Sequence, residues 1–383
     1  MAENSWENFV IKDLEKLRQK KVLIRVDFNL PTKDGVVLDT YRLDSVVSFL
    51  KDLYLVGAKI ILLSHFGEKG ESIKPVADIF IKKLPFTKFL QTTNFEEIKK
   101  AVDEMNAGET ILLENTRMFK GEEENVPSLA RNFAELGDVF INDAFSVSHR
   151  EHASIVGIPK SRLSYFGPTF ERELTNLSKL LNPKTPALLI LGGAKFGTKL
   201  NLIRKYVNQG VDLYVGGALA HAFMKGRGKN IGKSFYDDKV ALTDDLIFHA
   251  NIDIPNDVTT KSGDNLKLEE MTDNDIIVDI GKESILELDK LIDKSETIIM
   301  NGPLGLYEDG FRFGTEKILT KLSLLPKEKS VTIGGGDTVA CANTLGVIKD
   351  IGYVSLGGGA MLEYLANGTL PGITAISSSG LKI

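Results

Sequence analysis

The sequence predicts an α/β protein built from two doubly wound parallel-sheet lobes that are joined by a connecting helix. Apolar runs of strand length recur along the chain, and amphipathic helical segments separate them. This alternation indicates parallel sheets with helices on both faces. At 383 residues, the chain is also too long for one compact core. The runs expected as strands are VLIRVDF, AKIILLSH, ETILLENT, DVFINDAF, PALLILGG, VDLYVGGA, TIIMNGPL, SVTIGGGD and YVSLGGGA.

The composition is that of an ordinary globular protein, with a formal net charge of −5. This charge argues against a nucleic-acid partner, so an anionic ligand must be held by local positive charge. The segment MAENSWENFV has no basic stretch followed by an apolar one, and no later run is long enough to span a bilayer. We therefore expect a cytoplasmic protein with no membrane partner. The single cysteine, Cys341, excludes an internal disulfide and a cysteine-based metal site, and we expect it to be a packed small residue.

Residues 21–31, KVLIRVDFNLP, form the first expected strand. The side-chain period of two places Arg25, Asp27 and Asn29 on one face and apolar residues on the other, until Pro31 ends the strand. Polar groups on a strand otherwise suited to burial cost free energy unless a polar partner meets them. A ligand site and a solvated edge strand both fit this segment when it is taken alone.

Polar residues come directly after several expected strands of the first half, where ligands of open parallel sheets bind. They are Ser64, His65, Glu114, Asn115, Asn142 and Asp143. Arginine is scarce relative to lysine, yet several arginines lie beside strand ends in the first 150 residues, namely Arg25, Arg42, Arg117 and Arg150. Because guanidinium groups make fixed bidentate contacts with carboxylates and phosphates, this placement favours a small anionic ligand. Surface salt bridging is the alternative for any one of them.

The two halves of the chain carry different residues at the ends of their strands. Up to about residue 165 these positions hold Arg, His, Asn and Asp, whereas beyond it they hold glycine clusters with lysine. We therefore predict one lobe at residues 1–165 and a second at 166–365, with a connecting helix from about Thr169 to Leu181. The acidic run at residues 122–124 is expected to be a solvated loop or the approach to a helix N-terminus.

Glycine-rich turns come after the strands of the second half. They are GGAKFGTK at 192–199, GGALA at 216–220, GGGDT at 334–338 and GGGA at 357–360. Glycine lets backbone N–H groups approach a ligand closely, and the helix that begins next directs its positive end at an anion. The pattern predicts a phosphate-binding lobe. It matches neither the Walker sequence nor a clean dinucleotide fingerprint, so these two classes lose support.

Side chains near these turns suit a nucleotide. Lys195 and Lys199 are four residues apart, so a helix beginning near Lys195 would place both on one face. Asp337 comes after three glycines and is suited to capping a helix, to holding Mg²⁺, or to both. In NGPLGLYE, Pro303 shapes a rigid turn and Glu308 is an acceptor for ribose hydroxyls.

Taken together, these segments resemble the phosphoglycerate kinase family. The motifs that carry the resemblance, in the family's order from residue 21 to about 365, are KVLIRVDFNLP, SHFGE, LLENTR, INDAFSVSHR, LGGAKFGTK, GGALAHAF, MNGPLGLYE, IGGGDT and SLGGGAMLEYL. The resemblance implies two α/β lobes joined by a hinge helix, with an acidic-sugar site on the first and a nucleotide site on the second. It also implies that residues 366–383 return to the first lobe.

The resemblance implies a glycolytic kinase that catalyses reversible, in-line phosphoryl transfer in a closed two-lobe cleft. The substrates are 1,3-bisphosphoglycerate with MgADP, or 3-phosphoglycerate with MgATP, and the state is a monomer. The implied phosphoglycerate ligands are Asp27, Asn29, Arg42, His65, Arg117 and Arg150. The implied nucleotide ligands are Gly193, Ala194, Lys199, Gly217, Gly281, Asn301, Pro303, Glu308, Gly334, Gly335, Gly336, Asp337 and Thr338. Arg42 and Lys195 would flank the phosphoryl group in flight, and Asp337 would hold Mg²⁺.

The chain departs from the family pattern most at Glu68, where the family usually has arginine. One cation of the substrate site is replaced by an anion, with Lys69 as the nearest compensating charge. We therefore predict activity with weakened phosphoglycerate binding, by about 1–3 kcal/mol. Smaller departures are Leu30, Ala218, Gly197-Thr198, Lys282 and Met300. Most of them should be tolerated, because the residues expected to carry charge or face the nucleotide persist.

Other classes of function are weighed against this one. A catalytically silent relative that retains nucleotide binding is favoured by Glu68. It is opposed by the presence of Lys195, Lys199, Arg42 and Asp337. A two-lobed solute-binding protein would carry a secretion signal, which the sequence lacks. A nicotinamide dehydrogenase would carry the dinucleotide fingerprint. The kinase is therefore the predicted function.

Overall fold

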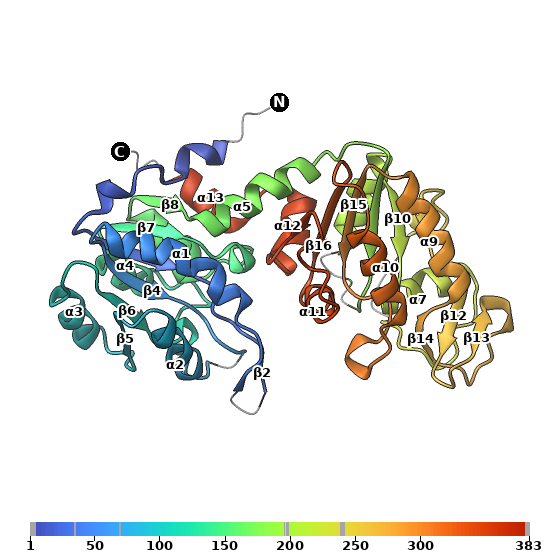
Figure 1. Ribbon diagram of the computed structural model, residues 1–383, viewed down its shortest axis with the longest axis horizontal. Helices are drawn as coiled ribbons and strands as arrows, with labels where there is room; N and C mark the ends of the chain where they lie inside the picture. The colour runs from blue at the N-terminus through green and yellow to red at the C-terminus, as the bar shows by residue number, and fades with distance from the viewer. Residues whose placement is uncertain are drawn as a thin grey trace. The chain divides into compact units, whose positions relative to one another are not determined.

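The computed structural model describes residues 5–33, 36–68, 70–194, 196, 199–237 and 242–379. Its chain divides into two compact units (Figure 1). Unit 1 comprises Met1–Thr175 with Thr369–Ile383, and unit 2 comprises Asn176–Gly368. The contact-defined boundary therefore lies ten residues beyond the predicted residue 165. Lys69 and Lys195, which the sequence singles out, lie outside the described residues.

Helix α5 (Pro168–Leu177) runs across this boundary and continues into a 3₁₀ helix, Ser178–Leu180. Its first turn belongs to unit 1 because Asp143 holds it there. The Asp143 Oδ1 atom accepts hydrogen bonds from the backbone N–H groups of Thr169 and Phe170, at 2.7 and 3.0 Å. Phe170 stacks on Phe166 with the ring centroids 4.7 Å apart.

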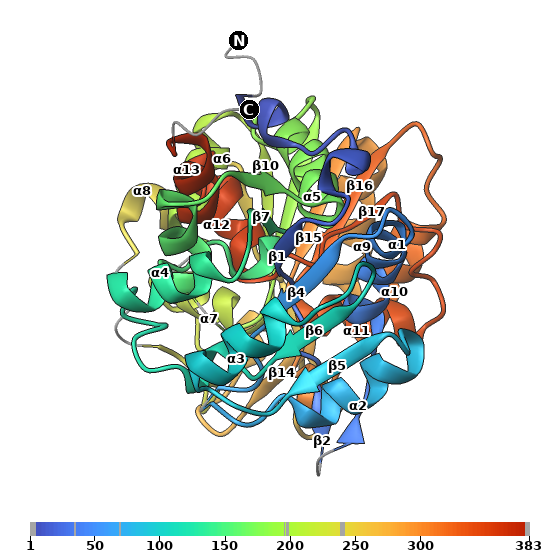
Figure 2. The same ribbon diagram turned by 90° about the vertical axis from the view of Figure 1, so that its left-hand side faces the viewer.

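Unit 1 is built on a six-stranded parallel sheet in the order β5-β6-β4-β1-β7-β8. Figure 2 shows β1, β4, β6 and β5 side by side in this order. The strands are β1 (Lys21–Arg25), β4 (Lys59–Leu63), β5 (Thr87–Leu90), β6 (Thr110–Leu113), β7 (Val139–Asn142) and β8 (Ser164–Phe166), with a small hairpin of β2 (Thr32–Lys33) and β3 (Val36–Val37). The helices are α1 (Tyr41–Leu55), α2 (Lys74–Lys83), α3 (Phe95–Asp103), α4 (Pro127–Glu135) and α13 (Pro371–Ser377).

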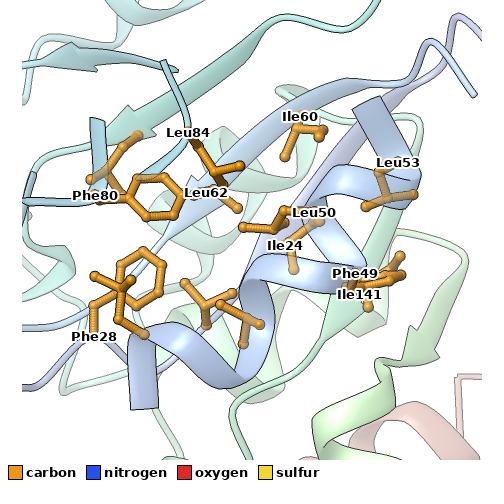
Figure 3. Close-up of a cluster of buried hydrophobic side chains, with 14 of the residues drawn as sticks. Ile24, Phe28, Phe49, Leu50, Leu53, Ile60, Leu62, Phe80, Leu84 and Ile141 are labelled. Atoms are coloured by element: carbon orange, nitrogen blue, oxygen red, sulfur yellow. The ribbon is translucent and has the colours of Figure 1, made fainter. Parts of the chain in front are cut away.

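The side chains of the unit 1 strands alternate between two cores. Ile24 and Leu62 pack with α1 and α2 on one face of the sheet (Figure 3). Leu23 and Ile61 pack with α3 and α4 on the other. This period-two alternation in fully buried strands, with helices on both faces, is the doubly wound arrangement that the apolar runs predicted.

The end of the chain returns to unit 1. Helix α13, drawn in red in Figure 1, packs among the blue and green elements of unit 1. It contacts the π-helical turn Ala153–Gly157, and the Gly372 N–H donates to the Ser148 carbonyl at 2.9 Å. A side chain at Gly372 would overlap Ser148, which a Cβ would approach to 2.8 Å.

Unit 2 is built on a second six-stranded parallel sheet in the order β11-β10-β9-β15-β16-β17. Its strands are β9 (Ala187–Leu191), β10 (Asp212–Val215), β11 (Ile252–Asp253), β15 (Thr297–Asn301), β16 (Ser330–Gly334) and β17 (Tyr353–Val354). A three-stranded antiparallel sheet, which the sequence did not predict, comprises β12 (Asp257–Thr260), β13 (Asn265–Lys267) and β14 (Ile277–Ile280). The helices are α6 (Lys199–Asn208), α7 (Gly217–Gly226), α8 (Asp244–Ile247), α9 (Lys282–Lys294), α10 (Phe313–Ser323), α11 (Gly336–Thr344) and α12 (Gly359–Asn367).

The unit 2 sheet is also covered on both faces. Leu188 and Ile190 of β9 pack with Leu288 of α9 and Ile318 of α10, in a core that includes Cys341. Cys341 is buried as a free thiol, which confirms its prediction as a packed small residue. Helices α6 and α7 supply further buried side chains, and α6 packs against β10 and α12. The predicted α/β class with two parallel-sheet lobes is confirmed.

Short helical turns complete the described chain. The 3₁₀ turns besides Ser178–Leu180 are Ser5–Phe9, Leu14–Leu17, Thr116–Met118, Phe145–Val147, Ile158–Lys160, Leu268–Glu270 and Tyr307–Asp309. Among the described residues, no helix combines the length and the apolar character needed to cross a membrane.

Two sequence predictions are wrong in detail. Strand β1 ends at Arg25, so Asp27 and Asn29 lie in the loop beyond the strand rather than on one of its faces. Of the two alternatives for the acidic run at residues 122–124, the approach to a helix N-terminus is confirmed, because α4 begins at Pro127. The solvated loop is wrong in part, because Glu122 is only 1% exposed. Its carboxylate accepts hydrogen bonds from the backbone N–H and the hydroxyl of Ser154, and these bonds offset the cost of burying it.

Candidate functional site

Asp27 is the centre of a polar cluster at the carboxyl edge of the unit 1 sheet. Its Oδ2 atom lies 2.8 Å from Nη1 of Arg42 and also accepts a hydrogen bond from Ser146. Its Oδ1 atom accepts the Asn29 N–H at 3.0 Å. Burial alone would raise the pKa of Asp27, but Arg42 and these donors outweigh it and lower the pKa to about 2. The carboxylate is therefore ionised at neutral pH.

The start of α1 positions Arg42. The Asp39 Oδ1 atom accepts the Tyr41 N–H at 2.6 Å, which satisfies an otherwise unpaired donor at the beginning of the helix. Arg42 is therefore in the first turn and extends back toward the loop after β1. Its Nη1 atom also lies 3.4 Å from the Asn29 carbonyl oxygen.

The loop after β4 brings Arg117 to the same cluster. The Asn29 Oδ1 atom accepts the Gly67 N–H at 2.9 Å, and Arg117 donates to the Gly67 carbonyl. Arg117 Nε lies 3.0 Å from Oε1 of Glu123, close enough for an ion pair but without hydrogen-bond geometry. Asn115, which is fully buried, holds this loop with its side chain. Its Oδ1 atom accepts the Phe66 N–H at 3.1 Å, and its Nδ2 atom donates to the Phe66 carbonyl at 2.6 Å.

His65 and Arg150 complete the predicted set in unit 1. His65 is buried, and burial together with nearby arginines lowers its pKa to about 3 despite the neighbouring Asp27 carboxylate. Arg150 is half-buried, and burial together with Arg117 lowers its pKa. Glu68 and Glu123 act on the Arg150 pKa in the opposite direction. Within the described part of the chain, the Arg150 guanidinium forms no ion pair.

Sequence reasoning missed two contributors to this cluster. Ser146 donates to Asp27, and its only signal is its place shortly after β7. Asn115 was noted as a polar residue after a strand, but its role in fixing the loop that carries His65 and Gly67 depends on contacts 44 and 49 residues away. Neither role is visible in local sequence.

Unit 2 contains a pocket of about 460 Å³ at the carboxyl edge of its sheet. It opens beyond β9 and β15, the neighbouring strands at which the order of the sheet reverses. Ligands of open parallel sheets bind at such switch points. The predicted nucleotide ligands that line the pocket are Gly193, Ala194, Lys199, Asn301, Pro303, Glu308, Gly335, Gly336 and Asp337.

Glycine is required where the pocket walls meet. A Cβ at Gly192 would lie 2.0 Å from the Pro303 carbonyl oxygen, so a side chain there would separate the turns after β9 and β15. Gly335 is the N-cap residue before α11 and has φ of 92°, a conformation that other residues rarely adopt. A Cβ at Gly336 would meet open space, so the backbone at this helix start is accessible to a ligand.

Lys199 is the buried cation of this pocket. It is 5% exposed, and its ammonium group donates to the Gly192 carbonyl. The described part of helix α6 begins at Lys199. The predicted stacking of Lys195 with Lys199 on one helix face stays a prediction, because Lys195 lies outside the described residues. Asp337 lies in the first turn of α11 and makes no side-chain capping bond, so of the two roles suggested for it the structure does not bear out capping.

Other predicted nucleotide residues do not line the described part of the pocket. Thr338 is buried and accepts the Gly302 N–H at 3.0 Å, so it supports the wall instead. Gly281 is packed against Asp257, whose carboxylate a Cβ would approach to 2.2 Å. Gly217 and Gly334 are also absent from the lining. Lining residues that were not predicted are Ala218, Gly302, Gly305, Leu306, Tyr307, Asp309, Gly358, Gly359 and Leu362.

Many of these unpredicted lining residues belong to segments that the sequence had marked as glycine turns. Gly358 and Gly359 are part of GGGA, and Gly305 to Tyr307 are part of NGPLGLYE. The sequence therefore identified the segments that line the pocket. It did not say which residue of a turn faces the ligand, because that depends on the backbone dihedral angles.

Comparison with known proteins gives one consistent family. A phosphoglycerate kinase family model matches residues 11–368. Phosphoglycerate kinases from Maricaulis maris and from a Wolbachia strain of Drosophila simulans are 37% and 38% identical to the chain. The alignments cover 93% and 94% of the chain, and 94% and 96% of the relatives.

Solved structures agree with this family. The phosphoglycerate kinase from Coxiella burnetii has a TM-score of 0.78 and 31% identity, covering 94% of this chain and 97% of that one. The enzyme from Pyrococcus horikoshii has a TM-score of 0.85 and 26% identity, covering 95% and 97%.

The two α/β units, one with a cationic cluster and one with a glycine-lined pocket, define a phosphotransferase architecture. The chain belongs to the phosphoglycerate kinase family. Its activity is that of a glycolytic kinase.

Proposed function

We propose that the cluster around Asp27 in unit 1 binds 3-phosphoglycerate or 1,3-bisphosphoglycerate. The observation that carries the proposal is the convergence of five predicted residues at one sheet edge. Asp27 bonds directly to Arg42 and to the Asn29 N–H, Gly67 connects Asn29 with Arg117, and His65 Nδ1 lies 4.0 Å from the Asp27 carboxylate. Guanidinium groups suit carboxylate and phosphate oxygens, whereas the Asp27 carboxylate and the Asn29 amide suit a hydroxyl group. Arg150 is the sixth residue, and its guanidinium supplies further positive charge.

We propose that the pocket of unit 2 binds ATP or ADP. Its volume is within the usual range for ligand pockets of roughly 300–1,000 Å³. Backbone N–H groups at the start of α11 and the ammonium group of Lys199 suit the phosphates. Glu308 lines the same pocket and suits the ribose hydroxyls.

The residues of this pocket are compatible with Mg²⁺ as part of the nucleotide complex. Among the described residues, no cluster of three or more His, Cys, Asp or Glu side chains forms a complete metal cage. Mg²⁺ is commonly held by one or two carboxylates together with substrate phosphates, and Asp337 presents one exposed carboxylate to the pocket. When bound there, Mg²⁺ would neutralise part of the phosphate charge.

The proposed reaction transfers the terminal phosphoryl group of ATP to the carboxylate of 3-phosphoglycerate. The bond from the terminal phosphorus to its bridging oxygen breaks as a bond to the carboxylate oxygen forms, and the reverse reaction uses ADP. A carboxylate is already ionised at neutral pH, so no general base is needed. Arg42 is proposed to stabilise charge on the transferring group. Lys195 is given the same role by the family resemblance alone.

Steady-state turnover with ATP, Mg²⁺ and 3-phosphoglycerate, each varied in turn, tests the proposed function. We expect saturable turnover that requires all three. A Lys199→Met variant should lose nucleotide affinity, whereas Lys179→Met, which changes an exposed lysine, should not. Absence of turnover in protein that still binds ADP by calorimetry would instead establish the silent-relative alternative. Cytoplasmic residence and a monomeric state are further parts of the proposal, and both have the family resemblance as their support.

A further inference from the structure

Arg25 is a buried charge that the proposed function does not use. It is the last residue of β1 and is 1% exposed. Its Nε atom donates to the Ser154 hydroxyl at 3.0 Å, and its Nη1 atom donates to the Val26 carbonyl. Its Nη2 atom lies 3.4 Å from Nδ1 of His65. The guanidinium therefore connects a buried network to a residue of the proposed substrate site.

The direction of each hydrogen bond in this network is determined by chemistry. A guanidinium has only donors. The Ser154 hydroxyl donates to the Glu122 carboxylate at 2.5 Å, so it meets Arg25 with a lone pair. The Ser154 N–H donates to the other Glu122 oxygen at 3.0 Å. Arg25 is thus held by groups behind it and presents an N–H donor to His65.

His65 Nδ1 lies between this donor and a carboxylate. Oδ1 of Asp27 is 4.0 Å from Nδ1, which is beyond hydrogen-bond length, whereas Arg25 is within it. The Asp27 oxygens are already engaged by Arg42, Ser146 and the Asn29 N–H. A nitrogen that accepts from arginine carries no proton, so the ring proton of a neutral His65 resides on Nε2.

The charges that face His65 also favour the neutral ring. Burial is the largest cause of its lowered pKa, and the Arg25, Arg117 and Arg150 guanidinium groups lower it further. Asp27 is the one acid that raises it. The sum leaves His65 unprotonated at neutral pH. His65 therefore gives the substrate site a neutral donor and no positive charge.

We propose that Arg25 is a positioning residue, which fixes His65 as the neutral Nε2–H tautomer so that His65 gives the acidic sugar phosphate a hydrogen-bond donor without a charge. The proposal rests on the proposed function for the contact between His65 and substrate. It predicts that phosphoglycerate binding takes up no proton at His65. It also separates the role of His65 from that of Arg42 and Arg117, whose charge is permanent.

The tautomer is measured in the unaltered full-length enzyme. Long-range ¹H–¹⁵N NMR correlations of the histidine rings, with His65 assigned by comparison with His65→Gln, should show unprotonated Nδ1 and protonated Nε2. The pattern should not change between pH 5.5 and 8. A proton on Nδ1, or titration of the ring near pH 6.5, would overturn the proposal. This measurement needs no variant of Arg25 and so does not depend on whether such a variant folds.

A kinetic experiment tests the role of Arg25 directly. The double variant Arg25→Gln, Glu122→Gln removes both buried charges together, so that neither is left unpaired. We expect the ratio of its KM for 3-phosphoglycerate to that of the wild type to change at least threefold between pH 8 and 5.5, because the Nδ1 atom of His65 loses the arginine donor that occupies it and can take up a proton beside Asp27. The ratio of KM values for ATP should stay constant over this range. A constant ratio for 3-phosphoglycerate would overturn the proposal.

Arg18→Gln provides a matched control, because Arg18 is an exposed arginine paired with Glu15. It should leave both ratios unchanged. Failure of the proposed function is distinguishable from failure of this inference. An unchanged KM for 3-phosphoglycerate in His65→Gln would remove His65 from the substrate site. The ring tautomer, compared between the wild type and the Arg25→Gln, Glu122→Gln variant, would still report whether Arg25 determines it.

Discussion

The two candidate ligand sites of this chain are constructed from different parts of the polypeptide. The cluster of unit 1 consists of charged and polar side chains, in which Asp27 is held by Arg42 and Ser146. The pocket of unit 2 is lined largely by glycine turns, and backbone groups at Gly335 and Gly336 form part of its wall. Both lie at the carboxyl edge of a parallel sheet, so the same sheet geometry supports two kinds of recognition.

Because of this difference, the two sites should tolerate different substitutions. A site made of side chains responds to changes of charge, because its specificity comes from ion pairs and hydrogen bonds. A site made of backbone responds to added volume, because a Cβ blocks close approach. Charge changes should therefore have their largest effects in unit 1, and steric changes in unit 2.

The strongest test of the expectation that unit 2 responds to added volume is Gly192→Ala. The new Cβ would lie 2.0 Å from the Pro303 carbonyl, and this oxygen belongs to backbone that cannot move without displacing the turn after β15. We expect the free energy of unfolding to fall by about 3 kcal/mol or more, with loss of ADP binding. Denaturant unfolding and calorimetry measure these effects.

Gly336→Ala provides the matched control for Gly192→Ala. Its Cβ would meet open space, and its φ does not require glycine. We expect unchanged stability together with weaker ADP binding, because the methyl group projects into the pocket region. Equal loss of stability in both variants would contradict the distinction between a wall contact and a ligand-facing backbone.

The stability of unit 1 should depend on pH through His65. The folded state keeps this ring unprotonated down to about pH 3, whereas an unfolded histidine binds its proton near pH 6.5. Between these values the unfolded state binds more protons, so the contribution of His65 to stability is complete above pH 6.5 and is lost as the pH falls. His65→Gln should remove this dependence. As the pH falls from 6 to 4, the free energy of unfolding of the wild type should decrease relative to that of the variant by about 1.4 kcal/mol per pH unit.

Urea unfolding of both proteins at several pH values measures this difference. His249→Gln is the control, because His249 lies in the other unit, in the turn before β11. If the difference in free energy of unfolding between wild type and His65→Gln does not vary with pH, His65 is protonated to the same extent in the folded and unfolded states.

Asp27→Asn tests the expectation that the unit 1 site responds to a change of charge, at the central residue of its cluster. The substitution keeps the shape but places an amide where Arg42 and Ser146 both need an acceptor. We expect the KM for 3-phosphoglycerate to rise about 10- to 100-fold, as for loss of a hydrogen bond to a charged group, with the KM for ATP within about twofold. Initial-rate kinetics with each substrate varied measure both values.

Asp103→Asn is the matched control for Asp27→Asn. Asp103 pairs with Lys21 at 2.6 Å, but this pair is exposed and such pairs contribute little. Neither KM should change in the control. A parallel rise of both KM values in Asp27→Asn would contradict the assignment of this cluster to one substrate.

The sequence predicted those parts of the fold that depend on local pattern. Most of the continuous apolar runs became central strands of the two parallel sheets, because strands buried on both faces must be apolar throughout. The run YVSLGGGA became the edge strand β17. It missed β5 and β8, the two edge strands of the unit 1 sheet. β5 contains exposed and half-buried residues and shows no long apolar run, whereas β8 is fully buried but only three residues long.

The sequence was less informative where a residue depends on a distant partner. Arg25 was grouped with Asp27 and Asn29 because their spacing fits one strand face, yet Arg25 is buried against Ser154, 129 residues away. The burial of Glu122 was missed for the same reason, because its hydrogen-bond partner is also Ser154. Residue spacing cannot reveal contacts made through the fold.

Glu68→Arg has the smallest expected effect and decides how far charge alone controls the unit 1 site. Glu68 is exposed and acts electrostatically on Arg150, so its charge is felt by a proposed substrate ligand but is screened by water. We expect the KM for 3-phosphoglycerate to fall about tenfold, equivalent to about 1.4 kcal/mol. The gain should shrink as salt is raised, because screening weakens an exposed charge more than a buried one.

Glu104→Arg makes the same change of net charge at an exposed residue that ends α3. It should leave the KM for 3-phosphoglycerate unchanged, so any gain in Glu68→Arg would be local rather than an effect of total charge. If Glu68→Arg left this KM unchanged or raised it, Glu68 would not weaken the site. The departure from the family pattern would then be compensated by other residues, and the contrast between a charge-controlled and a backbone-controlled site would rest on Asp27 and Arg42 alone.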